Sequence, residues 1–155
     1  MGKIFGARVE TMRLLFADSL SLSYLVPVLY GVWTCDRLLL SSVILAALAT
    51  HVLKQATATW AIGPRPAGAY GCGALCGGGA SGGQPGFPSG HTAIAAAIVA
   101  SFWLQGWNGA VWIGVPWVLL VAWARTAKEC HTNLQVLAGA GIGSGIVYAV
   151  HWISD

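Results

Sequence analysis

Five long apolar segments constrain what this chain can fold into more than any other feature. They cover residues 20–33, 38–53, 92–107, 110–124 and 134–152. A helix needs about 20 apolar residues to cross the hydrocarbon core of a bilayer, so we expect these segments to extend into their polar flanks. Only 8% of the residues are charged, whereas a soluble domain carries about 25%. So little charge cannot cover a water-exposed surface, and lipid is the expected solvent.

Each apolar segment is expected to be a helix, because backbone polar groups cannot stay unpaired in lipid. Before residue 20, Phe5, Val9, Met12 and Phe16 recur at helical spacing between charged residues. This pattern is typical of a helix lying in the membrane interface, although an extension of the first span would look the same. The sequence therefore predicts one all-α domain over 1–155: a polytopic membrane helix bundle of about five transmembrane helices with an N-terminal interfacial helix.

Two loops are expected to meet on one side of the membrane. Residues 60–88 form a long loop rich in glycine and proline after the second span, and residues 125–133 follow the fourth span. If each segment crosses once, both loops lie on the side of the N-terminus. A long loop on a compact protein is often functional, so a site assembled from these two loops is predicted.

Three polar clusters lie at the membrane edges of those loops. They are Lys54 with Arg65, then Ser89-Gly90-His91, then Arg125 with His131 and Gln135. Each residue alone has a structural explanation, such as a lysine reaching the interface or a histidine capping a helix. Together they supply three cations and two imidazoles without a pair of carboxylates, which suits a multiply charged anion.

Phosphate fits these clusters physically. The planar guanidinium of an arginine can bind two phosphate oxygens. A helix beginning after Pro88 presents free N–H groups and partial positive charge, which favour phosphate. Ser89 is expected to cap that helix or donate its hydroxyl, and Gly90 lets an anion approach the backbone closely.

Other polar residues receive structural interpretations. Cys72 and Cys76 lie in the long loop, where they form a disulfide, supply half of a metal site, or are simply unpaired small residues. No CxxC pair or histidine-rich stretch favours zinc, so neither a metal nor a cofactor is predicted. His51 and His151 belong to no cluster and are interpreted as interface histidines. The final span carries Gly139, Gly141, Gly143 and Gly145, which would let helices approach closely.

The three clusters resemble the type 2 phosphatidic acid phosphatase (PAP2) superfamily, whose pattern is K-x6-R-P, P-S-G-H and S-R-x5-H-x3-D. Arg65-Pro66 resembles the end of the first motif, residues 88–91 match the second, and Arg125 with His131 match the core of the third. The pattern departs at three places. Ala58 stands at the lysine position with Lys54 four residues earlier, Ala124 replaces the serine, and Gln135 replaces the aspartate.

The segment from His131 to Val136 reads H-T-x-x-Q-V and is similar to that of dolichyl-diphosphatases. Leu20-Ser21-Leu22-Ser23 and Pro64-Arg65-Pro66-Ala67-Gly68 also resemble that branch. On this reading Gln135 is a feature of the branch, and its amide oxygen would accept the imidazole N–H and hold the tautomer.

The resemblance implies a metal-independent lipid phosphatase acting on a polyprenyl diphosphate. His131 would be the nucleophile that forms a phosphohistidine, and His91 the acid and base. The phosphoryl oxygens would be bound by Lys54, Arg65, Ser89, Gly90 and Arg125. The alternatives are a phosphatase for phosphatidic acid, phosphatidylglycerol phosphate or undecaprenyl diphosphate, a non-catalytic membrane scaffold, and, less compatibly with the composition, a vanadate-dependent haloperoxidase.

The resemblance also implies an endoplasmic reticulum membrane with a lumenal active site. Every Lys and Arg except Arg37 falls on the active-site side, which the positive-inside rule would make cytoplasmic; we discount this because several of these charges serve phosphate. The expected partners are the lipid substrate, membrane lipids and, in a homo-oligomer, a second copy of the chain. No run of Lys or Arg is present, so nucleic acid is not an expected partner.

Overall fold

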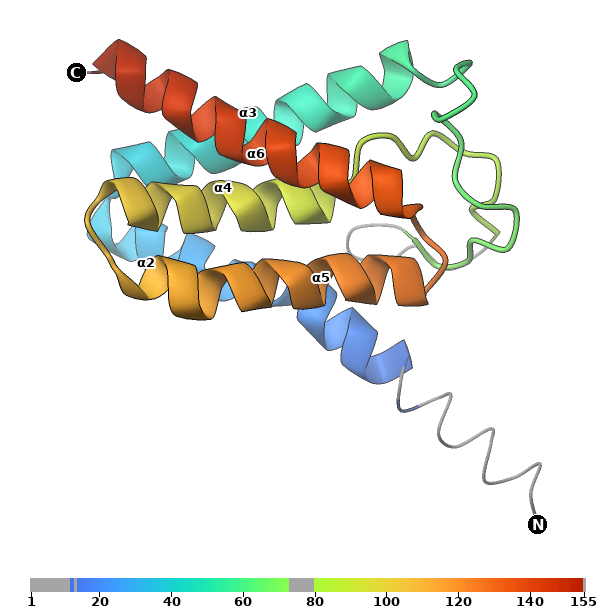
Figure 1. The fold of residues 1–155 in the computed structure, drawn as a ribbon, viewed down its shortest axis with the longest axis horizontal. Helices are drawn as coiled ribbons and strands as arrows, with labels where there is room; N and C mark the ends of the chain where they lie inside the picture. The colour runs from blue at the N-terminus through green and yellow to red at the C-terminus, as the bar shows by residue number, and fades with distance from the viewer. Residues whose placement is uncertain (1–11, 13, 73–79, 155) are drawn as a thin grey trace.

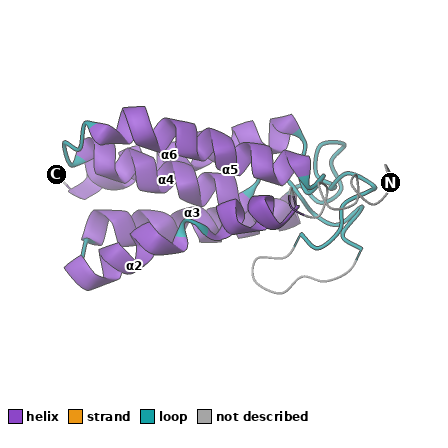
Figure 2. Cartoon of the chain, turned by 90° about the horizontal axis from the view of Figure 1, so that it is seen from below, coloured by secondary structure: helices purple, strands orange, loops and turns teal. Residues whose placement is uncertain are grey.

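The computed structural model describes residues 12, 14–72 and 80–154 (Figure 1). These residues form helices joined by loops. Within them, β structure is limited to isolated bridges between Pro64 and Pro85 and between Tyr70 and Ala80. Figure 2 shows the helices running along the long axis of the molecule, with the long loop gathered at one end. The prediction of an all-α bundle is confirmed.

The helices follow the five apolar segments, and most of them extend into the polar flanks as predicted; the exception is α4, which ends at Leu104 rather than near residue 107. Their bounds are α2 Leu25–Thr34, α3 Arg37–Ala56, α4 Gly90–Leu104, η1 Ala110–Gly114, α5 Val115–Ala127 and α6 Asn133–Ser154. Four stretches are long and apolar enough to cross a membrane, namely Leu14–Thr34, Arg37–Ala56, Ala110–Ala127 and Asn133–Ser154. The fifth apolar helix, α4, is shorter. With four helices of membrane-spanning length and composition, the chain is an integral membrane protein.

The first span begins earlier than residue 20, because Leu14–Thr34 is helical apart from a turn at residues 23–24. The described part of the predicted interfacial helix is therefore an extension of the first span. Phe5 and Val9 lie outside the described residues. The first span turns sharply into α3: Cys35 adopts a left-handed conformation (φ 54°), and Asp36 caps α3 by accepting the Leu39 N–H at 2.9 Å.

Helix α4 lies between α3, α5 and α6 and forms the centre of the bundle (Figure 1). Its buried face is made largely of small residues, which allows its neighbours to pack closely. A Cβ added to Gly139 or Gly143 of α6 would collide with the carbonyl oxygens of Ser89 and Ala93, so these glycines are in close contact with α4. Gly141 and Gly145 have no such neighbour. The prediction of glycine packing thus holds for one face of α6.

Helix α4 is too short to cross the hydrocarbon core of a bilayer by itself. Its 15 residues span about 22 Å, whereas the hydrocarbon core is about 30 Å thick. Its N-terminal side lies against the described parts of the long loop, residues 57–72 and 80–89: Ser89 is fully buried, and the Thr57 hydroxyl donates to the Phe87 carbonyl at 3.1 Å. The start of α4 is therefore a polar pocket enclosed by protein, in which a charged site can be held.

Candidate active site

Gln135, in the first turn of α6, holds the imidazole of His131 in place. The Thr132 hydroxyl accepts the Gln135 N–H, and the Gln135 side-chain oxygen accepts the Thr132 N–H, each at 3.3 Å, which is a capping box. The same oxygen lies 3.1 Å from Nδ1 of His131. The Gln135 amide nitrogen donates to the carbonyls of Ile62 at 2.9 Å and Pro64 at 2.8 Å. One side chain thus joins α6, the long loop and the imidazole.

These contacts fix the tautomer of His131. The carbonyls of Ile62 and Pro64 only accept, so they determine which end of the Gln135 amide faces them. The remaining amide oxygen also only accepts, and its partner Nδ1 of His131 must carry the proton. Nε2 therefore keeps its lone pair and is the nitrogen available for nucleophilic attack.

His131 lies in a strongly electropositive environment. It is 3% exposed. Its burial, followed by the positive charges of Arg65 and Arg125, lowers the pKa of His131 to about 2, and Lys54 acts in the same direction. The imidazole is consequently neutral at any physiological pH, as a nucleophile requires. The three cations predicted from the sequence are thus all brought within electrostatic reach of one imidazole.

The two arginines are held by main-chain and side-chain oxygens. Arg65 donates through Nη1 to the Cys130 carbonyl at 3.1 Å. Arg125 donates through Nη1 to the Ser21 hydroxyl and through Nη2 to the Cys72 carbonyl, both at 3.2 Å. Burial lowers the pKa of Arg65 from its ordinary value, but an arginine stays protonated in proteins. Both guanidinium groups are therefore fixed in place as charged donors.

Each of these arginines keeps one donor unsatisfied. The Nε atoms of Arg65 and Arg125 are buried without a hydrogen-bond partner; of the part of the chain that the structure describes, only the hydroxyls of Ser42 and Ser101 share this property. An unsatisfied buried donor costs about 1–3 kcal/mol, and more on a charged group. Two charged donors without partners, on arginines whose charges both act on His131, favour a site that binds an anion.

Lys54 reaches the site in spite of its displaced position in the sequence. It lies in the last turn of α3, whereas Ala58 lies in the turn after that helix. A Cβ added to Gly90 would stand 3.4 Å from Nζ of Lys54, so the ammonium group lies beside the first residue of α4. The free N–H groups of that helix end and Lys54 thus face the same space. Of the two roles predicted for Ser89, the helix cap is wrong, because its hydroxyl contacts the Thr92 hydroxyl at 3.0 Å and makes no cap to the backbone.

His91 faces a cavity that lies against the N-terminus of α4. Its ring packs edge-on against Tyr24, with centroids 5.8 Å apart. The cavity has a volume of ≈ 170 Å³ and is lined by Tyr24, Ala47, Thr50, His51, Lys54, Gly90, His91 and Ile94. His51, interpreted above as an interface histidine outside the clusters, lies on the rim of this cavity. The mixture of polar and apolar walls suits a phosphate joined to a lipid chain.

Sequence reasoning missed three contributions to the site. Ser21 and Tyr24 come from the first span; Ser21 lies in a segment that resembles the dolichyl-diphosphatase branch, but the contacts with Arg125 and His91 have no local signal in the sequence. The capping box was detectable, because Thr132 is followed by Gln135 at the required spacing. Recognising this capping box would have placed the Gln135 side chain next to His131.

The cysteine assignment is corrected by the structure. Cys72 is neither unpaired nor joined to Cys76: it forms a disulfide with Cys130, across 58 residues. Cys76 lies outside the described residues. A pairing between two loops cannot be read from spacing alone. The described residues contain no cluster of three or more His, Cys, Asp or Glu side chains that could hold a metal ion.

A helix bundle of membrane-spanning length that encloses two arginines, a lysine and two histidines defines a membrane-embedded phosphatase. A model of the PAP2 superfamily matches residues 37–155, and the chain belongs to that superfamily. The predicted membership of this superfamily is confirmed, and the chain is a phosphatase that acts on lipid phosphates.

Among solved structures, the chain is similar in fold to LpxE of Aquifex aeolicus. The TM-score is 0.62 with 24% sequence identity, over 93% of this chain and 86% of that chain. No curated protein sequence matches the chain significantly. The similarity to LpxE includes the first span, which the superfamily match does not cover, since it extends well beyond residues 37–155.

Proposed function

We propose that the protein hydrolyses a polyprenyl diphosphate of the dolichyl type, without a metal ion and through a phosphohistidine on His131. The observation that carries this proposal is the pair of buried, unsatisfied Nε donors on Arg65 and Arg125 beside a neutral imidazole. A phosphoryl group bound between these arginines would accept a hydrogen bond from each Nε–H and lie next to the nucleophile. Fixed cations can stabilise the charge of the transition state, which is the task a metal ion performs elsewhere.

In the first step, Nε2 of His131 attacks the terminal phosphorus. The N–P bond forms, the bond from phosphorus to the leaving oxygen breaks, and His91 gives that oxygen a proton. Lys54, Arg65, Arg125, Ser89 and the Gly90 N–H would bind the phosphoryl oxygens. Gln135 keeps the proton on Nδ1 throughout and accepts its hydrogen bond while the phosphorylated ring carries positive charge.

In the second step, His91 takes a proton from water as the water oxygen attacks phosphorus. The N–P bond breaks, inorganic phosphate leaves, and His131 returns to its neutral state. The edge-on packing of Tyr24 against His91 supports this role, because it holds the His91 ring at the cavity through which leaving group and water would pass.

The dolichyl-type substrate is favoured by the H-T-x-x-Q-V segment. The contacts of its threonine and glutamine support this choice, because they form the capping box and place an acceptor beside Nδ1 of His131. The same resemblance supports residence in the endoplasmic reticulum membrane with the site facing the lumen. Another lipid phosphate, such as phosphatidic acid, is the competing substrate class.

Phosphate release by purified protein in detergent and excess EDTA tests the proposal. Polyprenyl diphosphate and phosphatidic acid are compared side by side for the wild type, His131→Ala and the distant control His151→Ala. We expect EDTA-resistant release that prefers the diphosphate and falls about 10³-fold or more in His131→Ala, with an acid-labile phosphate mapped to His131. Preference for phosphatidic acid would reassign the substrate. Release from neither lipid by folded protein would favour a non-catalytic scaffold.

A further inference from the structure

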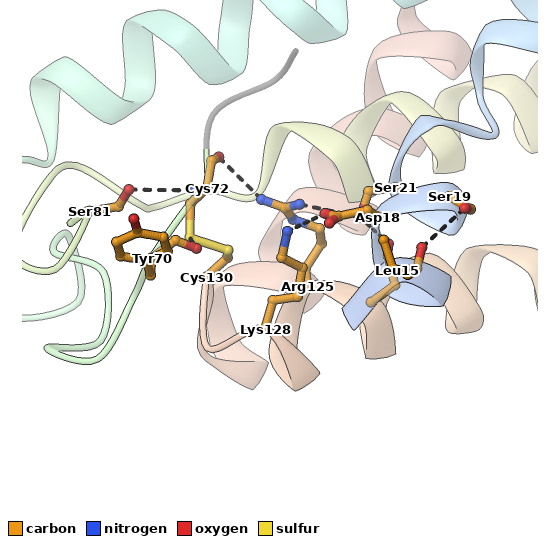
Figure 3. A network of polar contacts seen from close by, with 11 residues as sticks. Leu15, Asp18, Ser19, Ser21, Tyr70, Cys72, Ser81, Arg125, Lys128 and Cys130 are labelled. Carbon is orange, nitrogen blue, oxygen red and sulfur yellow. Dashed lines mark hydrogen bonds and ion pairs between the residues drawn. A yellow bond between two sulfur atoms is a disulfide. The ribbon is translucent and has the colours of Figure 1, made fainter. Parts of the chain in front are cut away.

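The Cys72–Cys130 disulfide lies inside the site rather than beside it. It joins the long loop to the short loop before α6. Both half-cystines are buried, at 3% and 0% exposure, and they form a small core with Ala69. Cys130 directly precedes His131. Figure 3 shows the disulfide next to Arg125, with the Cys72 carbonyl pointing at the guanidinium.

The two arginines bind the two half-cystines in a crossed arrangement. Arg125, at the end of α5, donates to the carbonyl of Cys72 on the long loop. Arg65, on the long loop, donates to the carbonyl of Cys130 on the short loop. The disulfide covalently links the two residues, Cys72 and Cys130, whose carbonyls accept these hydrogen bonds. Any separation of the loops would therefore pull both guanidinium groups away from their present positions.

The same short loop sets the position of the nucleophile. The main-chain N–H groups of Cys130 and His131 donate to the Arg125 carbonyl at 3.0 Å and 3.3 Å. His131 is thus tied to Arg125 on one side, to Gln135 on the other, and through Cys130 to the long loop. The S–S bond is the covalent member of this set of contacts, because it joins Cys130 to Cys72 on the long loop.

We propose that the Cys72–Cys130 disulfide is a positioning bond that makes activity depend on the redox state, and that the active-site face therefore lies in an oxidising compartment. The proposal rests on the function proposed above. Such disulfides persist in oxidising compartments and are rare in the cytosol. A displacement of about 1 Å between catalytic groups can lower the rate about 10²-fold. We therefore expect a large loss of activity when the two loops are no longer joined.

The redox step balances as a thiol–disulfide exchange. A dithiol such as dithiothreitol supplies two electrons and two protons, the Cys72–Cys130 bond breaks to give two thiols, and the reductant becomes its cyclic disulfide. Formation is the reverse reaction, with an oxidised dithiol protein of the compartment as the electron acceptor.

The first experiment compares oxidised, reduced and reoxidised wild-type protein in the EDTA assay, below its unfolding temperature. We expect kcat/KM to fall about 10²-fold on reduction and to return on reoxidation with oxidised glutathione. Cys35→Ser, which removes an exposed free thiol at the opposite end of the bundle, should respond in the same way. The double variant Cys72→Ser/Cys130→Ser should have the low rate and no response to reductant.

Three results would overturn the positioning role. One is full activity of the reduced protein with only a lowered unfolding temperature, which a purely structural disulfide would give. Another is peptide mapping that shows Cys72 as a free thiol or joined to Cys76. The third is a reduced protein that regains nothing on reoxidation although its disulfide has re-formed.

Vanadate binding separates this proposal from the proposed function. Vanadate is a phosphate analogue, and its affinity for oxidised and reduced protein can be measured without turnover. If the oxidised protein binds vanadate more tightly than the reduced protein but hydrolyses neither lipid, the positioning role stands and the proposed function fails. Equal affinities would reject the positioning role.

The compartment is tested in sealed vesicles with a membrane-impermeant maleimide. Cys35 lies in the turn between α2 and α3, at the end of the bundle away from the site. If the site faces the oxidising side, Cys35 is labelled only from the cytosolic side. Labelling of Cys35 from the oxidising side would overturn the assignment of the active-site face.

Discussion

The middle of the bundle and its loop end are buried to a similar degree but are held together differently. In the middle, Ala46, Ala97, Ala100 and Val147 form an apolar cluster with exposures of 0–9%. At the loop end, the most buried side chains include Arg125, His131 and Gln135, at 2%, 3% and 1%. The first region depends on close packing of small residues, whereas the second depends on hydrogen bonds, charge and a disulfide.

This comparison separates stability from activity. A substitution in the middle of the bundle should change how tightly the helices pack without moving the catalytic groups. A substitution at the loop end should change the position or protonation of those groups before it changes the fold. Four variants or conditions test whether the two regions are independent, and they are ordered from the largest expected effect to the smallest.

Gln135 is expected to give the largest effect, because it sets the tautomer of His131 and also holds the long loop. Gln135→Leu removes both functions and should lower kcat about 10⁴-fold, as loss of a tautomer-fixing partner does elsewhere. Gln135→Glu keeps an acceptor for Nδ1 but loses the donors to Ile62 and Pro64, so it should retain more activity than Gln135→Leu. Steady-state kinetics on the two variants would contradict the tautomer argument if Gln135→Glu were the slower enzyme.

The packing of α6 on α4 is tested by two glycines on different faces of one helix. In Gly143→Ala the new methyl group meets the Ala93 carbonyl, and overpacking of this kind costs up to about 3 kcal/mol. Gly145→Ala adds the same methyl group to an open face and should be neutral or slightly stabilising. Thermal unfolding in detergent measures both. Equal unfolding temperatures would show that this contact does not support the bundle.

Acidification should destabilise the loop end through His131. Its pKa is lowered to about 2 in the folded state, against about 6.5 when unfolded. Between these values the unfolded chain binds one more proton, so stability rises with pH up to about 6.5 and is lost as pH falls below it. From pH 7 to pH 5 this amounts to about 2 kcal/mol. His131→Ala should show a pH dependence of the unfolding free energy that is smaller by this amount.

Lys54 should give the smallest effect, because two arginines remain in the site when it is removed. Lys54→Ala is expected to raise KM about tenfold with little change in kcat, which corresponds to the loss of one charge-assisted hydrogen bond. Adding Ala58→Lys to this variant moves the charge to the position usual in the superfamily. Recovery of KM would show that the site accepts a lysine from either position. An unchanged KM in Lys54→Ala would remove this residue from the site.

Much of the architecture could be predicted from the sequence, because its signals are local. Apolar runs of sufficient length must be helical in lipid, and the number of crossings then places the two polar loops on one side. The motif residues Arg65, His91, Arg125 and His131 could be assigned from their order along the chain. The start of the first span, at Leu14 rather than residue 20, and the end of α4, at Leu104 rather than residue 107, could not be predicted, since helix ends depend on local caps and contacts.

The remaining features required the tertiary structure, because they join residues far apart in sequence. Cys72 and Cys130 are 58 residues apart, and no spacing rule pairs them. Ser21 reaches Arg125 across 104 residues, and Lys54 meets Gly90 only because α3 packs beside α4. Hydrophobic length and motif chemistry act within a segment, so the sequence alone determined the bundle and the candidate residues. The protonated nitrogen of His131, the unsatisfied arginine donors and the disulfide depend on which loops touch, and only packing in three dimensions decides that.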